Sequence, residues 1–109
     1  MTTKIGALVV ITTVPDENLG VKIAESLLQQ RLAACVHMMP CGSSLYRWQG
    51  AIVRADEITM LIKTTTARYP EVETAIKNLH TYDVPEIVAL PATATLAAYF
   101  DWILSETKQ

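Results

Sequence analysis

The chain has 109 residues, half of them hydrophobic, with nine Lys or Arg and eleven Asp or Glu residues. This length and apolar content fit a single domain, residues 1–109, built around one core. The net charge of −2 comes without a basic stripe, which argues against nucleic acid or an anionic membrane as a partner. No apolar run approaches the ~20 residues that span a bilayer, and the start carries no signal-peptide pattern, so a cytoplasmic protein is expected.

A strand and a helix are expected first. Residues 5–14 form a nearly continuous apolar run rich in β-branched residues, which is typical of a central strand. Asp16 suits the N-cap of a helix that ends near Arg31 and Leu32. The apolar positions of this helix repeat at helical spacing at Ile23, Ala24, Leu27 and Leu28.

The next segment predicts a long β-hairpin. Strand-like residues run from 33 to 48 and from 51 to 66, and Gln49-Gly50 between them suits a two-residue turn in which Gly supplies the positive φ. At ~3.3 Å per residue each arm could reach ~50 Å, whereas a compact chain of ~100 residues has a radius of gyration of ~13 Å. The hairpin tip should therefore overhang the core.

The first arm of this hairpin carries two further signals. Pro40 and Gly42 predict a bulge, because Pro cannot donate to a strand ladder. Tyr46 and Trp48 lie two positions apart near the tip, so both side chains point to one face. Two large aromatic residues on an overhanging ribbon need a partner surface. We expect them to anchor a neighbouring copy of the chain rather than to stack on a ligand.

The second half predicts a helix, a strand and a final helix. Pro70 favours a helix start, and Pro85 stops this helix after an apolar stripe of Val72, Ala75, Ile76 and Leu79. Residues 87–90 are typical of a short buried strand that ends at Pro91. The last helix has a stripe of Leu96, Tyr99, Phe100 and Ile103, with Trp102 off the stripe.

The element order is therefore β-α-β-β-α-β with an extra C-terminal helix. This order predicts an α+β, ferredoxin-like βαββαβ sandwich with a long hairpin between its second and third strands. The two helices within the βαββαβ order cover one face of the sheet, and the other face stays uncovered. A chain that is half apolar cannot leave such a face in water, so self-association is expected.

The sequence carries no motif of a nucleotide-binding, serine-hydrolase or zinc-protease site. With His37 and His80 as the two histidines, a Ser-His-Asp arrangement lacks support, and no enzyme is expected. The enzymatic alternative would use Lys63, His80 and Glu86 as acid, base and electrostatic groups. Lys63 lies mid-strand, where a charge should be paired or face an open site.

Two groups of residues contain metal-ligand types. Cys35, His37 and Cys41 share one strand face. On a straight strand Cys35 and Cys41 lie too far apart for a disulfide, and Cys41 lies too far from His37 for a zinc site, so free thiols in a reducing compartment are expected. The loop 80–86, His-Thr-Tyr-Asp-Val-Pro-Glu, offers imidazole and carboxylate ligands for a divalent cation. A structural alternative stays open, because a histidine is also favoured at a helix C-terminus. Residues 56–57 are expected at a solvated strand end.

Six ordered blocks of the sequence resemble the CutA family of divalent-cation tolerance proteins, from about Leu8 to Trp102. They are TTVPDE at 12–17, RLAACV at 31–36, YRWQG at 46–50, IKTT at 62–65, YDVPE at 82–86, and Tyr99 with Trp102. The resemblance implies a ferredoxin-like subunit in a tight homotrimer, with hairpin arms that extend sheets between subunits. It also implies a cytoplasmic protein linked to copper and other divalent metals.

The chain departs from the family pattern at three positions. Thr12 and Leu79 stand where members with proposed copper ligation can carry Cys and His, and Thr81 replaces a usual proline. The matching positions that remain imply a weak Cu²⁺ or Zn²⁺ site at His80 and Glu86. The resemblance also places Lys63, Tyr82 and Cys35 in the cleft between subunits, and Tyr46, Trp48 and Trp102 at the trimer interface.

The expected function is a homotrimeric, non-enzymatic protein of the divalent-metal response, with weak metal or small-ligand binding at the clefts between subunits. The alternative is a trimeric small-molecule signalling protein like the PII proteins. Against it, the hairpin is continuous strand up to its two-residue turn and leaves no long flexible loop.

Overall fold

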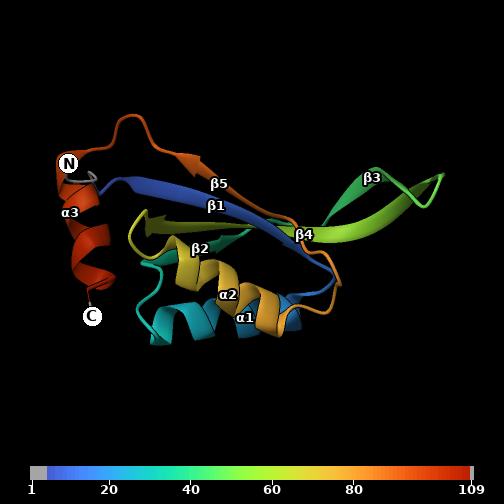
Figure 1. The fold of residues 1–109 in the computed structure, drawn as a ribbon, viewed down its shortest axis with the longest axis horizontal. Coiled ribbons are helices and arrows are strands. Elements are labelled where there is room, and N and C mark those ends of the chain that lie inside the picture. The colour runs from blue at the N-terminus through green and yellow to red at the C-terminus, as the bar shows by residue number, and fades with distance from the viewer. Residues whose placement is uncertain (1–4, 109) are drawn as a thin grey trace.

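The computed structural model describes residues 5–108 (Figure 1). The elements are β1 (Ala7–Val14), α1 (Glu17–Gln29), β2 (Cys35–Met38), β3 (Gly42–Trp48), β4 (Ala51–Thr65), α2 (Tyr69–Leu79), β5 (Ile87–Pro91) and α3 (Ala97–Glu106). The expected order of strands and helices is confirmed, with the first arm of the hairpin divided into β2 and β3. The first strand begins at Ala7, two residues later than predicted.

The strands form an antiparallel sheet in the order β2-β4-β1-β5, and β3 pairs with the far half of β4. The helices α1 and α2 lie together on one side of this sheet (Figure 1). Between the two layers lies the core, in which the largest fully buried aliphatic side chains are Val10, Val14, Ile23, Leu27, Met60, Ile62, Val72 and Ile76. This is the predicted ferredoxin-like α+β arrangement.

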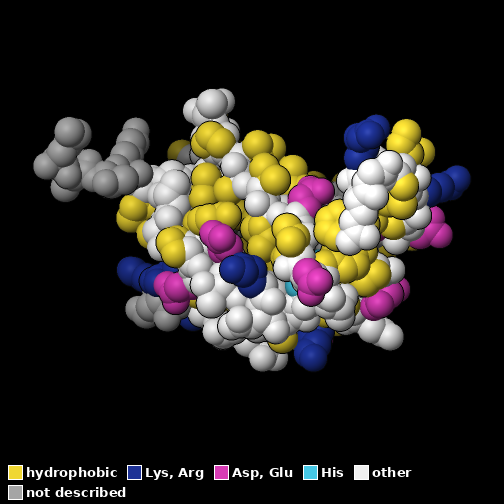
Figure 2. Space-filling model, turned by 45° about the vertical axis from the view of Figure 1, so that its right-hand side comes forward, with side chains coloured by type: hydrophobic (Ala, Val, Ile, Leu, Met, Phe, Trp, Pro, Cys, Tyr) yellow, Lys and Arg dark blue, Asp and Glu magenta, His cyan; other side chains and the backbone are white. Residues whose placement is uncertain are grey.

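The opposite face of the sheet remains largely open. The prediction that residues 87–90 form a buried strand is wrong, because Val88 and Leu90 are 46% and 48% exposed. The reason is the position of β5, an edge strand that pairs only with β1 and is covered by helices on one side. Figure 2 shows hydrophobic side chains gathered from the sheet to the hairpin, with acidic side chains between them.

The hairpin of β3 and β4 projects beyond the layer of helices, as expected (Figure 1). Its turn has positive φ at both central residues, 48° at Gln49 and 81° at Gly50, which is a type I′ turn that matches the strand twist. The predicted bulge is confirmed by the register. From Met38 to Gly42 the first arm advances four positions, while its partners on β4, Met60 and Glu57, are three apart.

Two helix ends are set by side chains. Oδ1 of Asp16 accepts the Leu19 amide at 2.9 Å, so the predicted N-cap of α1 is confirmed. The helix α2 ends at Leu79, well before Pro85, which was predicted to stop it. His80 has an extended backbone, with ψ of 147°, and its ring is fixed to β1. A side-chain contact therefore ends this helix rather than the proline.

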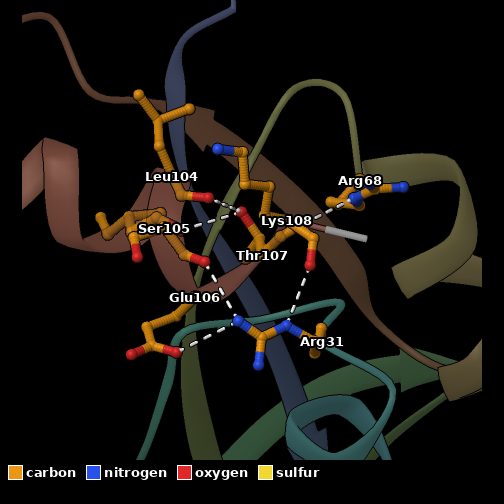
Figure 3. A network of polar contacts seen from close by, with 8 residues as sticks. Arg31, Arg68, Leu104, Ser105, Glu106, Thr107 and Lys108 are labelled. Carbon is orange, nitrogen blue, oxygen red and sulfur yellow. Dashed lines mark hydrogen bonds and ion pairs between the residues drawn. The ribbon is translucent and has the colours of Figure 1, made fainter.

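The helix α3 packs against β4 and is held at its C-terminal end by two arginines (Figure 3). Arg31 donates from Nε to the Lys108 carbonyl at 2.9 Å and from Nη2 to the Ser105 carbonyl at 3.2 Å. Arg68 donates from Nε to the Thr107 carbonyl at 2.9 Å. Guanidinium groups at this end complement the helix dipole and pair with carbonyls that have no helical partner.

The apolar stripe predicted for the last helix is only partly buried. Ile103 is buried, whereas Leu96, just before the helix, is 76% exposed. Tyr99 and Trp102 stack with ring centroids 5.6 Å apart and remain about two-fifths exposed, at 39% and 41%. These two rings therefore leave apolar surface on α3 in addition to the apolar side chains of the open sheet face.

Candidate functional site

A cleft of about 610 Å³ lies between the base of the hairpin and the loop that joins α2 to β5. One wall comes from β3 and the other from the loop, and β1 and β4 each contribute one residue. Its lining residues are Thr13, Ser44, Leu45, Tyr46, Trp48, Glu57, Tyr82, Asp83, Val84 and Glu86. This volume lies within the range of ~300–1,000 Å³ that is usual for small-ligand sites.

The lining carries charge of one sign. Glu57, Asp83 and Glu86 are acidic, and the lining residues include no Lys, Arg or His. Three carboxylates that face the same space repel an anion and attract a cation, most strongly where water is partly excluded. The cleft is therefore suited to a positively charged ligand.

Glu57 is the buried member of the acidic set, only 8% exposed. Its Oε2 accepts the Tyr82 hydroxyl at 2.9 Å and lies 3.5 Å from the Thr13 hydroxyl. Burial of the phenol raises the pKa of Tyr82 to about 12, and the hydrogen bond and negative charge of Glu57 act in the same direction. Tyr82 is thus neutral at physiological pH and donates to a carboxylate that would otherwise lack a partner.

His80 holds the loop to the sheet. Its Nε2 lies 2.7 Å from the carbonyl oxygen of Thr13, and its Nδ1 accepts the Tyr82 amide at 3.1 Å. Since Nδ1 is an acceptor, the neutral ring carries its proton on Nε2 and donates it to Thr13. Both ring nitrogens are engaged, so a metal ion could bind His80 only if one of these hydrogen bonds were released.

The structure brings together some of the residues predicted for the site and separates others. Glu86, Tyr82, Tyr46 and Trp48 all line the cleft, and His80 lies directly behind Tyr82. The remaining three lie elsewhere. Lys63 and Cys35 face each other in the register of β4 and β2 on the open side of the sheet, and Trp102 belongs to α3.

Metal-ligand geometry is incomplete within the part of the chain that the structure describes. Among residues 5–108, no group of three or more His, Cys, Asp or Glu side chains is placed to hold a metal ion. Cys35 and Cys41 are free thiols, as expected. Thr12, at the position where copper-binding relatives were expected to carry Cys, is fully buried and does not line the cleft.

Two residues of the cleft were not predicted. Glu57 was expected at a solvated strand end and is instead buried beneath Tyr82, and Thr13 contributes a carbonyl to His80 and a hydroxyl beside Glu57. Strand alternation does place Glu57 on the open face with Lys63. It does not reveal that the loop after α2 folds back over this end of the sheet.

The fold and the cleft define a ferredoxin-like α+β domain with a projecting hairpin and an acidic, aromatic-walled cleft at its base. Comparisons with known proteins agree with this fold and name a family. The family model "CutA1 divalent ion tolerance protein" matches residues 8–106. The divalent-cation tolerance protein CutA of Thermus thermophilus is 46% identical over 99 residues, which cover 91% of this chain and 96% of the relative.

Solved structures give the same result. CutA from Xylella fastidiosa superposes with a TM-score of 0.92 at 37% identity, covering 94% of this chain and 99% of that one. A structure described as the periplasmic divalent cation tolerance protein CutA from Archaeoglobus fulgidus superposes with a TM-score of 0.91 at 32% identity, with the same coverage. This chain belongs to the CutA1 divalent ion tolerance family. No helix within residues 5–108 is long and apolar enough to cross a membrane.

Proposed function

We propose that the protein is a homotrimeric, non-enzymatic protein of the divalent-metal response, located in the cytoplasm. It binds cations at clefts that are completed between subunits. The acidic cleft is the observation that carries this proposal, since its lining presents three carboxylates and no basic side chain. Family membership supports the link to divalent cations. The compartment is part of the proposal, because relatives are described from more than one compartment.

Self-association is supported by two separate apolar surfaces. On the open face of the sheet, Val88 and Leu90 are about half exposed, and on α3 the stacked rings of Tyr99 and Trp102 are about two-fifths exposed. On the hairpin, Tyr46 and Trp48 are 43% and 51% exposed. Apolar surface on two different elements fits a head-to-tail contact, which closes into a ring such as a trimer.

The metal site of this proposal is weak and shared. Glu86 is exposed and free to bind Cu²⁺ or Zn²⁺, whereas His80 must first release a hydrogen bond. Because residues 5–108 place fewer than three converging ligand side chains, a neighbouring subunit or water has to complete the coordination. Lys63 and Cys35 lie on the open sheet face, where an adjoining subunit would bring them into a shared cleft.

Light scattering and calorimetry test the two parts separately. We expect a mass three times that of the 12.0 kDa chain at micromolar concentration, and a monomer mass would refute the trimer. Titration with Zn²⁺ or Cu²⁺ should give weak binding that Glu86→Ala reduces and Glu25→Ala, on the exposed side of α1, does not. Binding that is unchanged by both Glu86→Ala and His80→Ala would remove the site.

A PII-like nucleotide-signalling role is the second candidate, supported by the shared trimeric plan that the sequence implies. Two features weigh against it. The strands β3 and β4 run without interruption to the type I′ turn, which leaves no flexible loop. The cleft lining also offers no basic side chain for phosphates. Thermal stabilisation by ATP would favour this role, and its absence would reject it.

A further inference from the structure

We propose that Arg31 and Arg68 act as a clamp that positions the C-terminal helix α3 for contact with a neighbouring copy of the chain. The stacked rings of Tyr99 and Trp102 on this helix are among the surfaces to which self-association is assigned above, so the interface part of the inference rests on the proposed function. The clamp itself consists of contacts within one chain. It makes the orientation of the two rings depend on two arginines that lie outside α3.

Apolar packing alone attaches α3 only weakly. Within the described residues, Ile103 is the one buried aliphatic side chain of this helix, and no residue of α3 belongs to the core between the sheet and the helices α1 and α2. By comparison, α1 buries Leu19, Ile23 and Leu27. A helix with little buried apolar surface opens at low cost, so polar contacts have to supply much of its attachment.

The polar contacts converge on the C-terminal end of α3 from two separate parts of the chain (Figure 3). Arg31 follows α1 and donates to the carbonyls of Ser105 and Lys108, at 3.2 and 2.9 Å. Arg68 precedes α2 and donates from Nε to the Thr107 carbonyl at 2.9 Å. Carbonyls at this end have no partner inside the helix, so the guanidinium groups bind α3 without competing with its own hydrogen bonds. The clamp therefore ties α3 to the ends of the two other helices.

The backbone of Arg31 indicates that the side chain is the reason for an arginine at this position. Its φ of 57° is the left-handed conformation that often follows a helix and that glycine adopts most easily. The Leu32 amide closes the same turn by donating to the Leu27 carbonyl at 2.9 Å. Glycine would suit this backbone better than arginine, so the turn does not account for the arginine. The contact of its side chain with α3 does.

The two aromatic rings depend on the clamp because they lie on the same rigid helix. Tyr99 and Trp102 stack with centroids 5.6 Å apart and are about two-fifths exposed, whereas the clamp holds the far end of α3. A helix of 10 residues behaves as one rod of ~15 Å, so a clamp on its last turn also sets the direction of rings nearer its start. An interface binds less tightly when its side chains must first be ordered. The arginines would thus stabilise assembly without touching the neighbouring copy.

Arg31→Gly tests the clamp, because glycine suits the backbone at this position but cannot reach α3. Hydrogen exchange of the full chain should show ~tenfold less protection at the Thr107 amide, which belongs to the last turn of α3. The Leu32 amide reports on the end of α1 and should keep its protection. Arg68→Gln should affect Thr107 in the same way, whereas Lys77→Gln, on the exposed side of α2, should have no effect.

Subunit exchange between isotopically labelled and unlabelled protein, followed by native mass spectrometry, tests the effect on assembly. We expect ~tenfold faster exchange of subunits in Arg31→Gly and in Arg68→Gln than in wild type. Arg31→Lys should fall between, because lysine keeps the charge but lacks the planar fork that reaches both carbonyls.

Wild-type protection of the Thr107 amide in Arg31→Gly would refute the clamp. Loss of that protection with an unchanged rate of subunit exchange would refute the positioning role. A monomeric wild type would overturn the trimer and the interface part of the inference together. A trimer whose subunit exchange is insensitive to both arginine variants would overturn this inference alone and leave the proposed function standing.

Discussion

Replacing His80 with alanine should destabilise the protein even when no metal ion is present. The substitution removes the 2.7 Å contact between Nε2 and the Thr13 carbonyl and leaves the Tyr82 amide without its acceptor 3.1 Å away. Each of these part-buried hydrogen bonds is worth about 1 kcal/mol, and the ring contact with Tyr82, at 4.7 Å between centroids, adds about 0.5 kcal/mol. We therefore expect a loss of about 2–3 kcal/mol.

The assay is urea unfolding in the presence of EDTA, together with hydrogen exchange at the Tyr82 amide. His37→Ala is the matched control, because His37 is exposed on β2 and should change stability by no more than about 0.5 kcal/mol. In His80→Ala the Tyr82 amide should exchange much faster, since its acceptor is gone. The structural role of His80 is refuted if this variant keeps wild-type stability and amide protection but loses Zn²⁺ binding, which is the behaviour of a free ligand.

Three further predictions concern single side chains. In an ultraviolet titration Tyr82 should ionise near pH 12, later than an ordinary tyrosine, and Tyr82→Phe should abolish this late step. Because its folded pKa is raised above the unfolded value of 10.0, its contribution to stability is complete below pH 10 and is lost as the pH rises towards 12. Thr12→Val should raise stability by about 1 kcal/mol in thermal unfolding, because within the described residues the buried Oγ1 of Thr12 has no hydrogen-bond partner. Arg68→Ala should cost about 1–2 kcal/mol in urea unfolding, since it removes the 2.9 Å hydrogen bond to the last turn of α3. An unchanged midpoint in either unfolding experiment would contradict the corresponding account.

Local chemistry explains why much of the fold could be predicted from the sequence. The Asp16 cap and the Gln49-Gly50 turn depend on residues adjacent in the chain, and both were confirmed. The buried face of α1 follows from helical spacing, as Ile23 and Leu27 show. In each case the residues that determine the feature lie within one turn of helix or one hairpin loop, so the sequence contains the whole interaction.

Features that depend on long-range contacts were harder to predict. The end of α2 is set by a hydrogen bond from His80 to a carbonyl far away in the chain, and the nearby Pro85 gave a misleading signal. The exposure of Val88 follows from the edge position of β5, which no property of residues 87–90 reveals. The burial of Glu57 depends on a loop that begins more than twenty positions later.

The candidate site was predicted in part for the same reason. Tyr82 and Glu86 belong to one short loop, so their proximity could be read from the sequence, and both line the cleft. Lys63 was expected in the same space, yet it lies six positions along β4 from Glu57, or ~20 Å at ~3.3 Å per residue. Only a neighbouring subunit could bring Lys63 close to an acidic cleft, which ties its proposed role to the trimer.

The bulge between β2 and β3 explains how the cleft forms at all. Opposite residues of an antiparallel pair lie on the same face of the sheet, and Tyr46 and Trp48 lie opposite Val53 and Ala51. These two residues are separated from Glu57 by even numbers of positions along β4, so their side chains and that of Glu57 point to the same face. With the register of β2 continued and no extra residue, both aromatic side chains would point to the opposite face, because a shift of one position reverses every side chain of a strand. Pro40 and its neighbours therefore do more than interrupt the ladder. The single inserted residue turns the aromatic pair towards the acidic end of the sheet, and the cleft exists because of that change in register.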